Sequence, residues 1–67
     1  MTTLPVCVRA KSPYSTIHKM PDGAVVDYVD PNIYYHPVDC KPGTDGLQWY
    51  QIGFDRWLPA NECREGE

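Results

Sequence analysis

The sequence lacks a long apolar run, an excess of positive charge and any cluster of glycines. No stretch approaches the roughly 20 apolar residues of a membrane helix, and residues 1–5 have neither part of a secretory signal, so we expect no membrane segment and no signal peptide. The formal net charge of −3 offers no general field for phosphate backbones, which makes nucleic acid a poor partner. Because the 5 glycines are scattered singly, we expect no phosphate-cradling loop and no cofactor.

Cysteine and histidine are also scarce. Cys7, Cys40 and Cys63 show no close paired spacing with one another or with the 2 histidines, so the sequence predicts no metal site. We expect three thiols, although an oxidising compartment would allow one pair and leave a third thiol free. No nucleophile elbow is present, and acids such as Asp27 and Asp30 fit solvated positions that maintain solubility. We therefore expect no enzymatic activity and no catalytic residue.

The 67 residues make one small domain. The 7 prolines leave few windows long enough for a helix. The Trp, Tyr and Phe side chains must supply much of the core, because each buries about 150–250 Å². We expect a single domain over 1–67, with an ordered part at 4–63 and frayed termini at 1–3 and 64–67.

Short alternating segments predict the strands. The predicted strands cover residues 4–9, 24–30, 47–52, 56–58 and a residue or two near 63. Between them, the sequence predicts a long loop at 10–23, an extended insertion or irregular hairpin at 32–46, a tight connection at 53–55 and a short 3-10 turn at 60–62. Five short strands indicate an all-β fold, a small closed five-stranded barrel.

Five side chains carry specific expectations about packing. In the first strand, Val6 and Val8 would form part of an inward apolar row, with Cys7 pointing outward. In the long loop, Ile17 and Met20 would anchor the chain to the core.

Several short motifs then occur in a particular order along residues 4–63. They are Val6–Arg9, Ser12–Pro13, Gly23, Asp45–Gly46, Trp49–Tyr50 and Arg56–Ala60. This order resembles bacterial SH3-type domains. The resemblance implies an SH3-like barrel that acts as a binding module, with the chain ends side by side, so that a bridge between Cys7 and Cys63 is conceivable. Arg56 departs from the glycine that this family usually has before its last tryptophan.

Residues 58–61 also resemble a turn of eukaryotic SH3 domains. In that family, residues at the positions of Trp49, Pro59 and Asn61 line a groove for proline-rich peptides. Here Glu62 stands where a tyrosine usually follows the asparagine, and residues 6–10 replace the tyrosine-rich first motif. Half of the aromatic groove is missing, so the sequence does not favour proline-rich peptides.

The aromatic segment 32–38 is the most informative feature for function. We predict a contact surface made of Tyr14, Tyr34, Tyr35, Trp49 and His36, because tyrosine and tryptophan combine large area with a polar tip. The alternative is that these tyrosines only cap a small core. A basic patch of Arg9, Lys11 and Lys19 is a weaker hypothesis, with ordinary surface lysines as the favoured interpretation.

These observations favour a non-catalytic binding module that docks on a protein partner. The resemblance and the small acidic chain suggest a bacteriophage or accessory bacterial inhibitor that acts on a host protein in the cytoplasm. A small structural component of a virion or assembly is the alternative. Peptidoglycan binding is a second alternative, with less weight because no secretory signal or attached hydrolase is visible.

Overall fold

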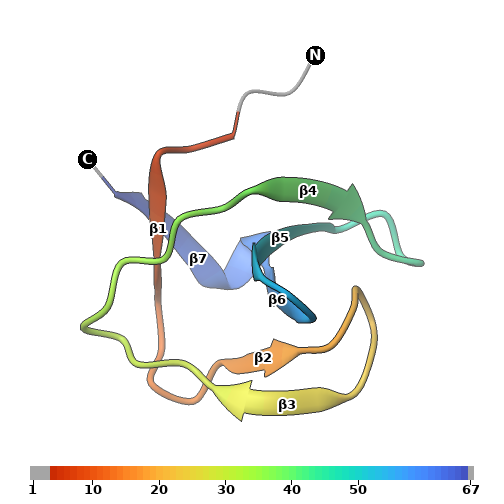
Figure 1. The fold of residues 1–67 in the computed structure, drawn as a ribbon, viewed down its shortest axis with the longest axis horizontal. Helices are drawn as coiled ribbons and strands as arrows, with labels where there is room; N and C mark the ends of the chain where they lie inside the picture. Colours follow the sequence, from red (N-terminus) through yellow and green to blue (C-terminus); the bar gives the residue numbers. More distant parts are fainter. Residues whose placement is uncertain (1–3, 67) are drawn as a thin grey trace.

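A computed structural model describes residues 4–66 and is built almost entirely from short β-strands (Figure 1). The elements are β1 (Cys7–Ala10), β2 (Thr16–His18), β3 (Val25–Tyr28), β4 (Asp39–Pro42), β5 (Gln48–Gly53), β6 (Arg56–Pro59), the 3-10 turn η1 (Ala60–Glu62) and β7 (Cys63–Gly66). The predicted all-β class is confirmed, and the 3-10 turn lies where the sequence predicts it. Within residues 4–66, no helix has the length and apolarity that crossing a membrane requires.

The strands form two antiparallel sheets. β1 pairs with β7, and the other strands follow the order β3-β2-β6-β5-β4. Figure 1 shows β1 and β7 crossing side by side at one end of the larger sheet, with the chain from β3 to β4 passing around the outside. The two sheets are not closed into a barrel, which differs from the expected closed cylinder.

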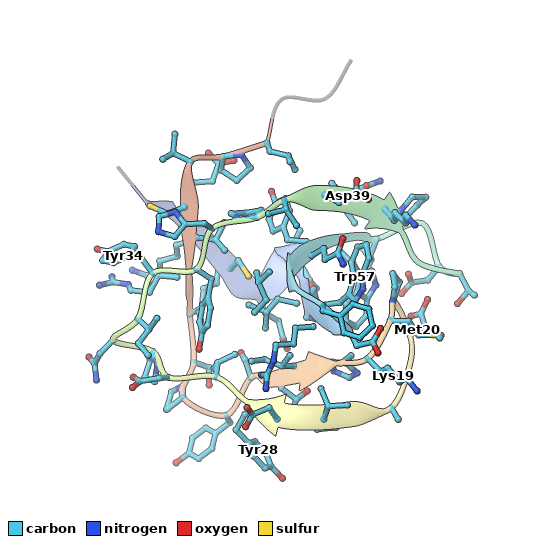
Figure 2. The ribbon with its side chains drawn as sticks, viewed as in Figure 1. Lys19, Met20, Tyr28, Tyr34, Asp39 and Trp57 are labelled. Atoms are coloured by element: carbon cyan, nitrogen blue, oxygen red, sulfur yellow. The ribbon has the colours of Figure 1, made fainter. Side chains whose placement is uncertain are left out.

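The core lies between the two sheets and is small. Its central cluster consists of Ala10, Ile17, Val29 and Leu58. The predicted anchoring role of Ile17 is confirmed, since this side chain is 2 % exposed, but Met20 is 54 % exposed and the prediction for it was wrong. Met20 follows the end of β2 and lies in the turn toward β3, where the chain leaves the core (Figure 2).

Two strands fall in segments that the sequence predicts as irregular. β2 lies inside the predicted loop at 10–23, and β4 lies inside the predicted insertion at 32–46. β2 has only three residues and is held between β3 and β6. β4 contains a proline and pairs along its whole length with β5. Neighbouring strands, rather than a local pattern, specify both elements.

The two ends of the described chain differ from expectation. β1 begins at Cys7, so Val6 precedes the strand and is 80 % exposed, and the prediction that Val6 points inward was wrong. Val8 is fully buried as predicted. Cys7 starts on the face of β1 opposite Val8, as predicted, but its side chain is buried, at 6 % exposed. Residues 64–66 are paired with β1 in β7 rather than frayed, because β1 offers a free edge to the polar tail. The predicted fraying at 1–3 and at 67 lies outside the described residues.

Candidate functional site

β1 is bonded along both of its edges. On one side it pairs with β7. On the other, Val8 and Tyr35 exchange two backbone hydrogen bonds of 2.8 Å, which brings the segment at 34–36 against β1. Because successive side chains of an extended chain alternate between faces, this pairing directs Val8 and Tyr35 to the core and Tyr34 to the outside. Val8 is fully buried, and Tyr35 packs on the core cluster.

The outward side chains on this part of the molecule form a basic and aromatic surface. The guanidinium carbon of Arg9 lies 5.6 Å from the ring centroid of Tyr34. Arg64 is the direct partner of Arg9 in the register between β1 and β7. Lys11 continues the same row, with its amide 2.9 Å from the Glu62 carbonyl oxygen. We call the surface of Arg9, Lys11, Tyr34 and Arg64 the Arg9 face; Figure 2 shows Tyr34 at the outer side of β1.

The charges of the Arg9 face are unusual for this chain. Three of the 6 lysine and arginine residues lie here, although the protein carries a net charge of −3. Two arginines directly opposite each other on neighbouring strands repel, and such an arrangement destabilises a sheet. Among residues 4–66, the ion pair within 4 Å is Arg56 with Asp27, so no described carboxylate neutralises Arg9 or Arg64 at that distance. Within residues 4–66, the Arg9 and Arg64 guanidinium groups therefore have no carboxylate within 4 Å, and that of Arg9 lies beside an aromatic ring.

The aromatic segment contributes both to the core and to the surface. Tyr34 is 49 % exposed. Tyr35 is partly buried, and its hydroxyl oxygen accepts the Asp30 amide hydrogen at 3.1 Å. His36 is exposed and donates from Nδ1 to the Val6 carbonyl oxygen at 3.0 Å, which ties the entry of β1 to this segment. Tyr35 thus packs against the core, as the alternative interpretation predicts, whereas Tyr34 remains on the surface.

The remaining candidate residues differ widely in exposure. Tyr14 is 85 % exposed in the loop after β1. Asn61 is exposed. It lies beside Lys11 of the Arg9 face, because its carbonyl oxygen accepts a hydrogen bond from Lys11 Nζ at 3.1 Å. Trp49 is 7 % exposed and lies opposite Pro59 between β5 and β6, so it offers little area to a partner.

Sequence reasoning considered Arg9 and Lys11 but grouped them with Lys19 and did not include Arg64. Lys19 follows β2 and lies across the molecule from Tyr34 (Figure 2). Arg64 joins the face only because β7 pairs with β1. The signal in the sequence is weak, since neither an arginine in a polar tail nor a tyrosine in a loop indicates its partner.

The Trp49 ring belongs to a second polar cluster, which fixes the turn between β2 and β3. His18 Nδ1 lies 2.8 Å from the Gly23 carbonyl oxygen, and His18 Nε2 lies 2.8 Å from Thr16 Oγ1. Because a carbonyl oxygen can only accept, Nδ1 donates, and the neutral ring accepts the Thr16 hydroxyl at Nε2. The His18 ring also meets Trp49 edge-on at a centroid distance of 5.0 Å. Both imidazole nitrogens therefore form hydrogen bonds within the hairpin of β2 and β3.

Two of the three thiols donate hydrogen bonds to neutral acceptors. Cys40 Sγ donates to Gln48 Oε1 at 3.2 Å, and Cys63 Sγ donates to the Pro59 carbonyl oxygen at 3.4 Å. Burial, helped by the nearby Glu62 carboxylate, raises the pKa of Cys63 to about 11. A thiol with such a pKa is protonated near neutral pH and is a poor nucleophile. Residues 4–66 contain no cluster of three or more His, Cys, Asp or Glu side chains that could hold a metal ion.

The register also separates two cysteines at the chain ends. Cys7 lies opposite Gly66, whereas Cys63 lies opposite Ala10, and all three cysteines are free. Three residues along a strand span about 10 Å, and a disulfide needs Cα atoms closer than about 7 Å. Cys7 and Cys63 also project from opposite faces of this pair of strands. The chain ends do run side by side, but this geometry does not allow the bridge.

The outer strands of the larger sheet are protected against pairing with another chain. β3 and β4 form its two edges. Asp27 Oδ1 accepts the Tyr28 amide hydrogen at 2.8 Å, and Asp39 Oδ1 accepts the Cys40 amide hydrogen at 2.8 Å. Pro42 offers no amide hydrogen on β4. These carboxylates occupy backbone donors that an added strand would need, so the edges of the larger sheet are poorly suited to pairing with another chain.

Comparison of the chain with family models, with curated proteins and with solved structures gives no match.

Proposed function

We propose that the chain is a non-catalytic binding module that docks on a protein partner through the Arg9 face. The observation that carries this proposal is the half-exposed Tyr34 ring beside the Arg9 guanidinium, in a patch without a neutralising carboxylate among the described residues. Tyrosine and arginine are the residue types that contribute most binding energy at protein interfaces, because both bury large areas and retain polar groups.

We further propose that the fold is a variant of the bacterial SH3-type arrangement. Three features support this: the last strand returns beside the first, a 3-10 turn leads directly into the last strand, and the segment after β1 carries a hairpin of β2 and β3. In this interpretation, residues 29–38 are an insertion that provides the aromatic part of the binding surface.

An acidic chain with a local basic face fits a protein partner better than a nucleic acid, because the net charge of −3 opposes a phosphate backbone at longer range. We propose an inhibitor or adaptor that acts on a host protein in a bacterial cell. A virion component and a peptidoglycan-binding module remain the alternatives, and they predict retention by particles or by cell-wall sacculi.

Affinity capture with two matched variants tests the proposed function. Tyr34→Ser removes the aromatic ring of the Arg9 face, and Phe54→Ser removes a ring that is 89 % exposed in the turn between β5 and β6. We expect a partner from a lysate of the source organism to be retained by the wild type and by Phe54→Ser. Tyr34→Ser should retain at least about fivefold less partner, with an unchanged melting temperature.

Two results would contradict the proposed function. One is equal capture by the wild type and Tyr34→Ser. The other is retention only by purified peptidoglycan or by particles, which would favour the alternative functions.

A further inference from the structure

We propose that the Arg9 face binds a carboxylate-rich, extended segment of the partner. This inference rests on the proposed function and adds to it the chemistry of the segment that the partner presents.

Two arginines lie directly opposite each other on the Arg9 face. Arg9 and Arg64 are register partners across β1 and β7. Their Cα atoms are about 5.5 Å apart in such a hydrogen-bonded pair, and the side chains project to the same face. A carboxylate placed between them would accept hydrogen bonds from both groups and remove their mutual repulsion. The folded chain alone does not offer this compensation within 4 Å among residues 4–66.

The described carboxylates near the Arg9 face start on its opposite side or lie at one end of it. Glu65 is the register partner of Val8, so its side chain starts on the opposite face from Arg64. The pKa of Tyr50 is raised first by burial and then by the negative charge of Glu65, which agrees with Glu65 facing that side. Glu62 is on the Arg9 side of the strand pair, but it lies opposite Lys11, at one end of the Arg9 face. Arg9 and Arg64 can therefore both donate hydrogen bonds to a carboxylate of the partner.

The basic side chains along β1 have the spacing of side chains in an extended peptide. Arg9 and Lys11 are two residues apart, so same-face positions repeat after about 7 Å. An extended peptide repeats its own side chains at the same interval, so acids at alternate positions match successive cations. Tyr34 provides a flat wall beside the first cation, at 5.6 Å from Arg9. A planar carboxylate fits the forked guanidinium groups better than it fits lysine alone.

The test uses a short fluorescent peptide in which Glu and Ser alternate, together with the same peptide carrying Gln in place of Glu. Arg64→Glu and Lys19→Glu change the net charge of the protein by the same amount, but Lys19 is exposed and lies across the molecule from Tyr34 (Figure 2). Arg64→Glu also gives Arg9 an opposite charge across the strands, so folding should be preserved or improved. Anisotropy titrations at low ionic strength compare the affinities.

We expect the affinities of the wild type and Lys19→Glu for the Glu peptide to agree within about threefold. The affinity of Arg64→Glu for the same peptide should be at least about tenfold lower. The Gln peptide should bind none of them measurably. Absence of binding by the Glu peptide, equal weakening by the two variants, or tighter binding of single-stranded DNA than of the Glu peptide would each overturn the inference. If the captured partner is lost with Tyr34→Ser but retained by Arg64→Glu, the inference fails while the proposed function stands.

Discussion

The turn between β2 and β3 allows a quantitative test of how the small fold is held together. Asp22 has a positive φ of 60°, and its Oδ2 accepts hydrogen bonds from the Thr44 amide at 2.6 Å and the Thr44 hydroxyl at 3.2 Å. These bonds join this turn to the turn between β4 and β5. Asp55, in the turn between β5 and β6, has a similar φ of 54°. Its carboxylate makes no hydrogen bond to another residue within the described chain.

Replacing each residue with glycine separates the backbone effect from the side-chain effect. Glycine relieves about 1 kcal/mol of left-handed strain but loses a similar amount of entropy on folding, so Asp55→Gly should change the free energy of unfolding by less than about 0.5 kcal/mol. Asp22→Gly has the same backbone balance and also removes two bonds to a carboxylate. We expect a loss of about 1–2 kcal/mol, which lowers the melting temperature by about 5–15 °C in a domain of this size.

Thermal unfolding followed by tryptophan fluorescence measures both variants. Gly43→Ala provides a second route to the same contact, because a Cβ there would lie 2.5 Å from Asp22 Oδ2 and 2.7 Å from Trp49 Nε1. Like Asp22→Gly, Gly43→Ala should lower the melting temperature. Equal melting temperatures for Asp22→Gly and Asp55→Gly would show that the contact between the two turns contributes nothing.

Two further predictions follow from titratable groups. The Arg56 side chain, and then the Tyr28 amide, lower the pKa of Asp27 from 3.8, so the stabilisation by this carboxylate is complete above the unfolded pKa and is lost as pH falls through the folded pKa. The melting-temperature advantage of the wild type over Asp27→Asn, measured by circular dichroism, should therefore shrink in acid; a constant difference would exclude this linkage. Because Cys63 has a pKa of about 11, iodoacetamide at mildly alkaline pH should label it more slowly than an unstructured cysteine peptide, as mass spectrometry would show. Equal rates would contradict its burial.

The strands that the sequence predicts best are those with a strong local pattern. Residues 47–52 and 56–58 correspond closely to β5 and β6, because each segment is rich in aromatic and aliphatic residues and has a clear stop signal at Gly53 or Pro59. The strand at 24–30 corresponds to β3, although its four residues are exposed at the edge of the sheet. Local patterns could not reveal β2, β4 or the extension of β7 beyond residue 63, since pairing partners distant in the sequence specify these segments.

The candidate surface was predictable only in part. The sequence identifies Tyr34 as a residue suited to an interface, and the alternation along the chain explains why its neighbour Tyr35 is in the core instead. The association of Tyr34 with Arg9 and Arg64 depends on two separate pairings of β1, one with the segment at 34–36 and one with β7. No local spacing in the sequence encodes either pairing.

A nuclear magnetic resonance titration of the isotopically labelled protein with the alternating Glu peptide locates the binding surface residue by residue. We expect the largest backbone shift changes at Arg9, Tyr34 and Arg64, and small changes along β3 and β4. Changes concentrated on the edge strands, with the Arg9 face unaffected, would contradict the proposed binding surface.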